Sequence, residues 1–172
     1  MLNKLSPRLV YFFGFLICAG LLAFALYLQY FQKEDPCPLC IFQRVVFILI
    51  GIFFLIAALH NPKKIGAYIY TVLITLSAGI GIALAGRHVW LQNLPKDKVP
   101  ECGPDLQFML ENFPLSKMLS LVLKGSGECA AAGWRFLSLT IPAWSLIFYI
   151  LLTVLAIAIP ILIRRAGLKK AA

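Results

Sequence analysis

Two cysteines, at positions 37 and 40, are separated by two residues, which is the spacing of thiol–disulfide redox motifs. Two intervening residues bring both sulfur atoms close enough to form a disulfide within one small, tight loop. An apolar run that begins at Ile41 predicts a helix, and Cys40 lies at its expected start. Free N–H groups and the helix dipole stabilise a thiolate there, and the thiolate is both the attacking and the leaving species in disulfide exchange. The motif therefore predicts a redox-active pair.

A second pair of cysteines, Cys102 and Cys129, brackets much of the long segment between the third and fourth apolar runs. Taken alone, this pair indicates a structural disulfide in an outer loop. Beside a redox motif, a pair that exchanges disulfides with Cys37 and Cys40 becomes the favoured interpretation. A four-cysteine zinc site is disfavoured because the second pair is not a CxxC motif, so we expect no bound metal. Cys18 lies within an apolar run and is expected to be a small buried hydrophobe.

Two further side chains, Arg44 and His88, could act on a ligand near these thiols. Arg44 lies four residues after Cys40, on the same face of the expected helix and one turn deeper. An arginine in the hydrocarbon is costly, so it either snorkels to the headgroups or faces the bundle interior, where it would stabilise the thiolate and bind a polar group. His88 follows the third apolar run, at the same membrane level. It is either solvated, packed, or hydrogen-bonded with Arg44 to a carbonyl ligand.

The composition indicates a membrane protein. Of 172 residues, 61% are hydrophobic and 13% are charged, and the mean hydropathy is +0.88. Soluble domains contain roughly 45–50% apolar and about 25% charged residues, so an ordinary soluble domain and a disordered chain are both excluded. Four apolar runs are long enough to cross a bilayer as helices, at residues 9–31, 41–59, 66–86 and 141–163. We expect one membrane domain, residues 1–172, folded as an all-α bundle of four transmembrane helices.

Lysine and arginine are concentrated at one end of the expected bundle. The termini and the loop after the second run hold eight basic residues and no acidic one: Lys4, Arg8, Lys63, Lys64, Arg164, Arg165, Lys169 and Lys170. By the positive-inside rule both termini are cytoplasmic, so the loops at about 32–40 and 87–140 face outward. The basic excess is thus a topology signal, and we expect lipid but no nucleic acid as a partner. Within the long loop, residues 116–123 predict a short helix, either along the membrane interface or packed on the spans. Three tryptophans near the outer boundary predict an aromatic belt: Trp90, Trp134 and Trp144.

Together these motifs resemble the bacterial DsbB family of disulfide bond formation proteins, over nearly the whole chain. The matching features are Cys37-x-x-Cys40-x-x-x-Arg44 at the top of the second span, Arg87-His88-x-x-Leu91-Gln92 at the end of the third, and Cys102 and Cys129 in one outer loop. The resemblance implies a multi-pass enzyme of the bacterial inner membrane that oxidises thiols with a quinone. Its partner would be a periplasmic DsbA-like protein of thioredoxin fold, and its electron acceptor ubiquinone or menaquinone.

The resemblance also implies an order of disulfide exchange. A thiol of the partner attacks a Cys102–Cys129 disulfide at Cys102, and the released Cys129 exchanges with Cys37. Cys40 then leaves as a thiolate beside the quinone. The side chains that would hold the quinone ring and stabilise this thiolate are Arg44 and His88.

Two alternatives stay open. A membrane scaffold or small transporter subunit would use the outer cysteines as structural disulfides, although the expected spans hold almost no polar groups to form a solute path. An enzyme resembling vitamin K epoxide reductase would share the quinone and thiol chemistry, with a different physiological acceptor and direction. A second cysteine pair that follows the third span favours the DsbB pattern.

Overall fold

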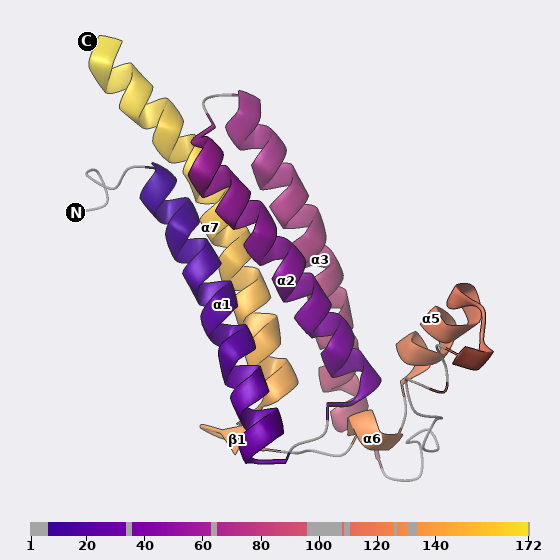
Figure 1. The fold of residues 1–172 in the computed structure, drawn as a ribbon. Coiled ribbons are helices and arrows are strands. Elements are labelled where there is room, and N and C mark those ends of the chain that lie inside the picture. Colours follow the sequence, from indigo (N-terminus) through magenta and orange to yellow (C-terminus); the bar gives the residue numbers. More distant parts are fainter. Residues whose placement is uncertain are drawn as a thin grey trace.

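The computed structural model describes residues 7–33, 36–62, 65–95, 108, 111–125, 127–130 and 134–171. Four long helices run in alternating directions and form an elongated bundle (Figure 1): α1 Pro7–Phe31, α2 Pro38–His60, α3 Ile65–Gln92 and α7 Ile141–Ala171. Each contains a stretch long and apolar enough to cross a membrane. The predicted all-α bundle of four membrane helices is therefore confirmed.

Among the helix boundaries that differ from the sequence prediction, two change the position of a reactive side chain. α2 begins at Pro38 with Cys37 as its N-cap residue, so Cys40 lies within the first turn rather than at the start. Proline suits this first helical position because its φ is already helical and it has no N–H group to satisfy. α3 continues past the expected end at Gly86, so the segment up to Gln92 is helix rather than outer loop. The apolar run ends at the first charged residue, Arg87. The helix continues because its backbone hydrogen bonds do not require apolar side chains.

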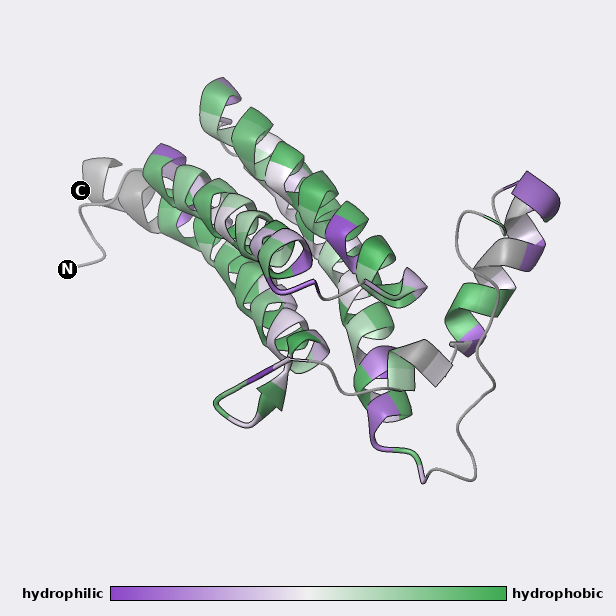
Figure 2. Cartoon of the chain, turned by 60° about the horizontal axis from the view of Figure 1, so that its bottom comes forward, coloured by the Kyte–Doolittle hydropathy of each residue, from purple (hydrophilic) through white to green (hydrophobic). Residues whose placement is uncertain are grey.

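The helices pack in sequence order, α1 on α2 and α2 on α3, and α7 closes the bundle mainly against α3. The close approach of α1 to α2 depends on a small residue, because a Cβ atom at Gly14 would lie 2.6 Å from the ring of Phe54. Hydrophobic side chains also cover the outward faces of the helices (Figure 2), where Ile48, Ile69 and Val154 are all exposed. Such faces suit contact with lipid. The buried residues of the four helices form one connected core that includes Val122 and Cys129. A single domain over residues 1–172 stays a prediction.

The segments that connect α3 to α7 lie toward the end of the bundle where α1 ends and α2 begins (Figure 1). They comprise helices α5 Leu115–Lys124 and α6 Gly127–Ala130, and a hairpin of β1 Arg135–Phe136 with β2 Leu139–Thr140. α5 corresponds to the short helix predicted at 116–123. Its last turn is fixed to the bundle because the Arg87 guanidinium donates to the carbonyls of Leu123 and Lys124, at 3.1 and 3.2 Å. The rest of α5 projects sideways, and its contact with a membrane interface stays a prediction.

Candidate functional site

The CxxC motif forms the N-terminus of α2. Cys37 and Cys40 are free thiols, and Cys37 has the extended backbone of a cap residue, with φ −63° and ψ 162°. The carbonyl of Cys37 accepts the first helical hydrogen bond, from the N–H of Ile41 at 3.2 Å. The N–H groups of this first turn have no partner within the helix, and together with the dipole they favour negative charge on a nearby sulfur. The helix-start environment expected from the sequence is present, but it is centred on Cys37.

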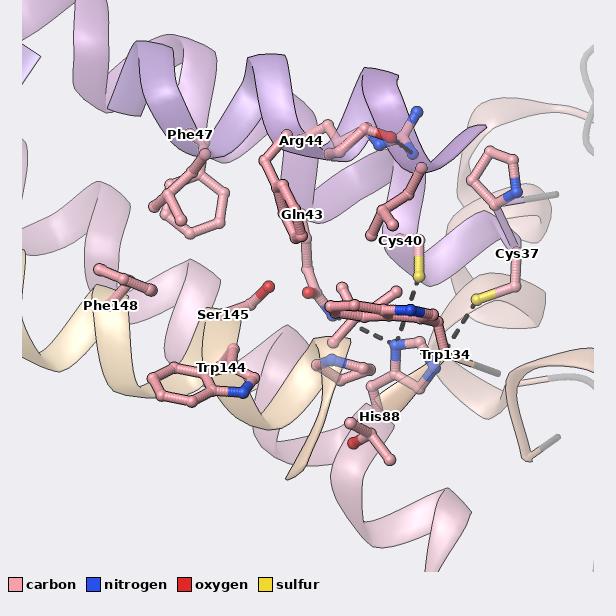
Figure 3. A pocket seen from close by; sticks show the side chains of 18 of the residues that line it. Cys37, Cys40, Gln43, Arg44, Phe47, His88, Trp134, Trp144, Ser145 and Phe148 are labelled. Carbon is pink, nitrogen blue, oxygen red and sulfur yellow. Dashed lines mark hydrogen bonds between the residues drawn. The ribbon is translucent and has the colours of Figure 1, made fainter. Parts of the chain in front are cut away.

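His88, from α3, lies against both thiols of the motif (Figure 3). Its Nε2 atom is 3.7 Å from the Cys37 sulfur and its Nδ1 atom is 4.0 Å from the Cys40 sulfur. The side chain is only 2% exposed. The continuation of α3 beyond Gly86 is what brings the ring to this depth. Of the outcomes that the sequence left open, a solvated histidine is thus wrong.

Gln43 is a site residue to which the sequence reasoning gave no role. Its side chain is 3% exposed, and its Nε2 atom is 3.3 Å from Nδ1 of His88. A buried amide is expected to be hydrogen-bonded. One feature of the sequence could have pointed to Gln43: it is a polar residue in a mainly apolar run. It lies three positions after Cys40, which places it on the same helix face as that thiol.

Cys129, from α6, contacts the same imidazole. Its carbonyl oxygen is 3.1 Å from Nε2 of His88. The sulfur atoms of Cys37 and Cys129 and a ring nitrogen of His88 all lie within 4.8 Å of one another. These are ligand types that zinc uses, although Nε2 already faces the Cys129 carbonyl. Cys102, the other member of the predicted exchanging pair, lies outside the described residues.

Arg44 turns toward α1. Its guanidinium donates to the side-chain oxygen of Gln29 and to the carbonyl oxygen of Ala25, the latter at 3.2 Å. Both acceptors belong to α1, so the arginine faces a neighbouring helix as the sequence allowed, rather than reaching only for headgroups. Arg44 and Cys40 line the same cavity, which keeps the charge close to the thiol side of the site.

A cavity of about 740 Å³ opens beside these residues. The polar and thiol groups on its wall are Cys37, Cys40, Gln43, Arg44, His88, Gln92, Thr140 and Ser145, and its aromatic groups are Phe24, Phe47, Trp134, Phe136, Trp144 and Phe148. The amide oxygen of Gln92 is buried and has no hydrogen-bond partner among the residues that the structure describes. Most of the remaining lining is aliphatic, so the cavity suits a flat, largely apolar ligand with a few hydrogen-bonding atoms.

The tryptophans depart in part from the predicted aromatic belt. Trp134 stacks on Phe136 with ring centroids 5.8 Å apart, and the indole N–H of Trp144 donates to the Phe136 carbonyl at 3.1 Å. Both indoles line the cavity because the hairpin folds back over the start of α7. Trp90 alone keeps an exposed position, where it stacks under the Arg87 guanidinium at 4.2 Å.

Residues 7–159 match the family model described as disulfide bond formation protein DsbB. The chain belongs to the DsbB family. Disulfide bond formation protein B of Nitrosococcus oceani is 53% identical over 154 residues, which cover 90% of this chain and 91% of that protein. The protein of the same name from Hahella chejuensis is 52% identical over 146 residues, 85% of this chain and 88% of the relative. One from Xanthomonas oryzae pv. oryzae is 44% identical over 164 residues, 95% of each chain.

Membership of the DsbB family makes the chain a disulfide-forming, multi-pass membrane protein and hence an oxidoreductase. Such chemistry requires that two sulfur atoms approach to about 2.05 Å as one bond replaces another. Cys37 and Cys129 already lie within 4.8 Å, on two separate elements that share one histidine.

Proposed function

We propose that the chain is a thiol:quinone oxidoreductase of the bacterial inner membrane, with both termini cytoplasmic. It would reoxidise a periplasmic, DsbA-like dithiol protein of thioredoxin fold and reduce ubiquinone or menaquinone. The observation that carries this proposal is the largely apolar cavity with the CxxC thiols, Arg44 and His88 in its lining. A structural disulfide would need no such cavity beside its sulfur atoms.

The lining fits a quinone. Carbonyl oxygens on a quinone ring accept hydrogen bonds, and the Arg44 guanidinium has N–H groups to donate. The His88 ring lines the same cavity, with Nε2 directed at the Cys129 carbonyl. The unpartnered amide oxygen of Gln92 would accept from a hydroxyl group of the reduced form. Aliphatic and aromatic side chains around them suit the ring faces and an isoprenoid tail. The quinone supplies an acceptor for two electrons and two protons, while this chain's residues orient it beside Cys40.

Each exchange in the relay that we propose forms one disulfide as it breaks another. A partner thiolate attacks the Cys102 sulfur and breaks the Cys102–Cys129 bond. The Cys129 thiolate then attacks the Cys37 sulfur, the Cys37–Cys40 bond breaks, and its electron pair leaves on Cys40. The 4.8 Å grouping of Cys37, Cys129 and His88 supports the second step. The first step rests on the family resemblance.

The energetics favour a quinone over a further disulfide as the final acceptor. A DsbA-like partner, with a potential near −120 mV, is itself a strong oxidant. Each 30 mV of adverse difference costs about 1.4 kcal/mol for two electrons, so another dithiol pair would reoxidise it with difficulty. A lipid-soluble acceptor makes the whole step downhill, and only a site open to the bilayer can use one.

The first prediction concerns turnover of the purified protein in detergent with a reduced DsbA-like partner and ubiquinone-1. We expect one quinone to be consumed for each partner dithiol oxidised, followed by quinone absorbance and thiol titration together. Substitution of any one of the four outer cysteines by serine should abolish turnover: Cys37, Cys40, Cys102 and Cys129.

Cys18→Ser is the matched control, because Cys18 is buried against Gly51 in the core, away from the cavity wall. This variant should keep full turnover. Full turnover by the Cys102→Ser protein would rule out the relay. If no quinone is consumed while the outer cysteines are bridged and resist the reduced partner, the disulfides are structural and the chain acts as a scaffold.

A further inference from the structure

A chain of two hydrogen bonds joins three elements at the site. The Gln43 amide of α2 contacts Nδ1 of His88 in α3 at 3.3 Å, and Nε2 of His88 contacts the carbonyl of Cys129 in α6 at 3.1 Å. A carbonyl oxygen only accepts hydrogen bonds, so Nε2 must carry the proton. In the neutral imidazole Nδ1 is then an acceptor, and Gln43 must present its NH₂ group. Each group in the chain has one consistent role.

The burial of these groups makes the chain of bonds costly to break. Gln43 is 3% exposed, His88 2% and Cys129 1%. A donor or acceptor that loses its partner in such a place cannot turn to solvent instead. Without the Gln43 donor, the Nε2 tautomer would lose one of the two hydrogen bonds that favour it, and the tautomer with the proton on Nδ1 would set two acceptors against each other at Cys129.

The short helix α6 depends on an external anchor. It has only four residues, Gly127–Ala130, and so has little hydrogen bonding of its own. The carbonyl that His88 binds belongs to the cysteine whose sulfur lies within 4.8 Å of Cys37. The hydrogen bond therefore acts on the element that must approach the CxxC motif.

We propose that Gln43 is a positioning residue for disulfide exchange, which sets the His88 tautomer so that the ring holds the Cys129 segment against Cys37. The proposal rests on the relay described above and adds to it. The exchange itself is balanced by sulfur chemistry alone: the Cys129 thiolate bonds to the Cys37 sulfur, and the electron pair of the broken bond leaves on Cys40. Gln43 takes no part in bond making.

The test measures the approach of the two sulfur atoms without quinone or partner. In the Cys40→Ser/Cys102→Ser protein, Cys37 and Cys129 form one disulfide in a glutathione redox buffer, and its equilibrium constant reports their proximity. Gln43→Leu has a similar volume but no donor, and we expect it to lower this constant about tenfold, as for the loss of one buried hydrogen bond. The matched control is Gln32→Leu, an equivalent change at an exposed site just past α1, which should leave the constant unchanged.

A second variant, Gln43→Glu, separates tautomer control from packing. A carboxylate only accepts, so it demands a proton on Nδ1, and the ring then binds Cys129 only as imidazolium, with protons on both nitrogens. Among the described residues, the other titratable groups that face the ring in this protein are the thiols of Cys37 at the start of α2 and of Cys129 in α6, because Cys40 is replaced by serine. These thiols titrate in both proteins. We therefore divide the equilibrium constant of the Cys37–Cys129 disulfide in the Gln43→Glu variant by that in the Cys40→Ser/Cys102→Ser parent at each pH, which cancels their contribution.

We expect this ratio to approach one at about pH 6. It should fall as the pH rises toward about 9, because the His88 imidazolium loses a proton and with it the hydrogen bond to Cys129. A purely structural role for Gln43 predicts a ratio that does not change with pH. The proposal is overturned if the ratio is flat, or if Gln43→Leu matches Gln32→Leu. Failure of the quinone assay alone would refute the proposed function and leave this measurement intact.

Discussion

At the scale of single residues, Arg44 shows how a charge can be kept at the end of a membrane helix. An arginine at a bilayer centre costs about 2.5–3.5 kcal/mol on insertion scales, and less toward the edge. Hydrogen bonds to Gln29 and to the Ala25 carbonyl satisfy part of the guanidinium and fix it at the cavity wall. These two acceptors come from α1, so the hydrogen bonds of Arg44 also link α2 to its neighbouring helix.

This geometry leads to a prediction for quinone binding. Arg44→Leu should raise the KM for ubiquinone-1 by roughly tenfold to a hundredfold, which corresponds to the loss of one hydrogen bond from a charged donor. Gln29→Leu should raise it less, because the arginine stays but loses one of its two fixed acceptors. Steady-state kinetics with saturating partner protein measure both values. An unchanged KM in Arg44→Leu would remove this residue from the quinone site.

At the scale of elements, Tyr149 of α7 fixes the rotation of α2 and α3 about their axes. Its hydroxyl donates to the Gln43 carbonyl at 2.7 Å, and its ring stacks on Phe47 with centroids 4.1 Å apart and planes 9° apart. Gly81 of α3 faces the same ring, and a Cβ atom there would clash with it. The buried Tyr149 side chain therefore contacts both α2, which carries Gln43, and α3, which carries His88, and helps to fix their relative orientation.

Two glycines of α3 give a matched test of this junction. Gly81→Ala should lower the melting temperature in detergent, because the new methyl group overpacks the Tyr149 ring at a cost of about 1–3 kcal/mol. Gly79→Ala is the control, since a Cβ atom there would have no other atom within 4 Å. It should leave the melting temperature unchanged or raise it slightly, given the higher helix propensity of alanine. Equal effects of the two substitutions would mean that the tyrosine junction adds no packing constraint.

The elements also show what the sequence could and could not reveal. Apolar run length located all four helices, because the hydrocarbon requires such runs. Residue type and spacing singled out the CxxC motif, Arg44 and His88. Gln43 and the hairpin around Trp134 were missed, because their roles depend on which side of α2 faces α3 and on how the outer segments fold back. Neither is encoded in local periodicity, since these helices are apolar on nearly every side.

At the scale of the whole molecule, the charges divide the two ends of the bundle. The end with the first turn of α2 holds the reactive thiols, and the opposite end holds the loop after α2 and the start of α1. All seven acidic residues lie in the segments expected at the first end: Glu34, Asp35, Asp97, Glu101, Asp105, Glu111 and Glu128. A dithiol partner must reach the thiol end from the compartment in which disulfides persist, so orientation in the membrane is a requirement of the proposed function.

This orientation can be measured with single cysteines in a variant that lacks the five native ones. Gln32→Cys and Asn93→Cys lie at the thiol end, and His60→Cys lies at the far end of α2. We expect the first two to react with a membrane-impermeant maleimide in intact spheroplasts, and His60→Cys to react only after the membrane is opened. The basic residues beside His60 stay in place in this variant, so the positive-inside signal is kept. Labelling of His60→Cys in intact spheroplasts would mean that the protein has the opposite orientation. Its native thiols would then face the reducing cytoplasm, which would rule out a periplasmic partner.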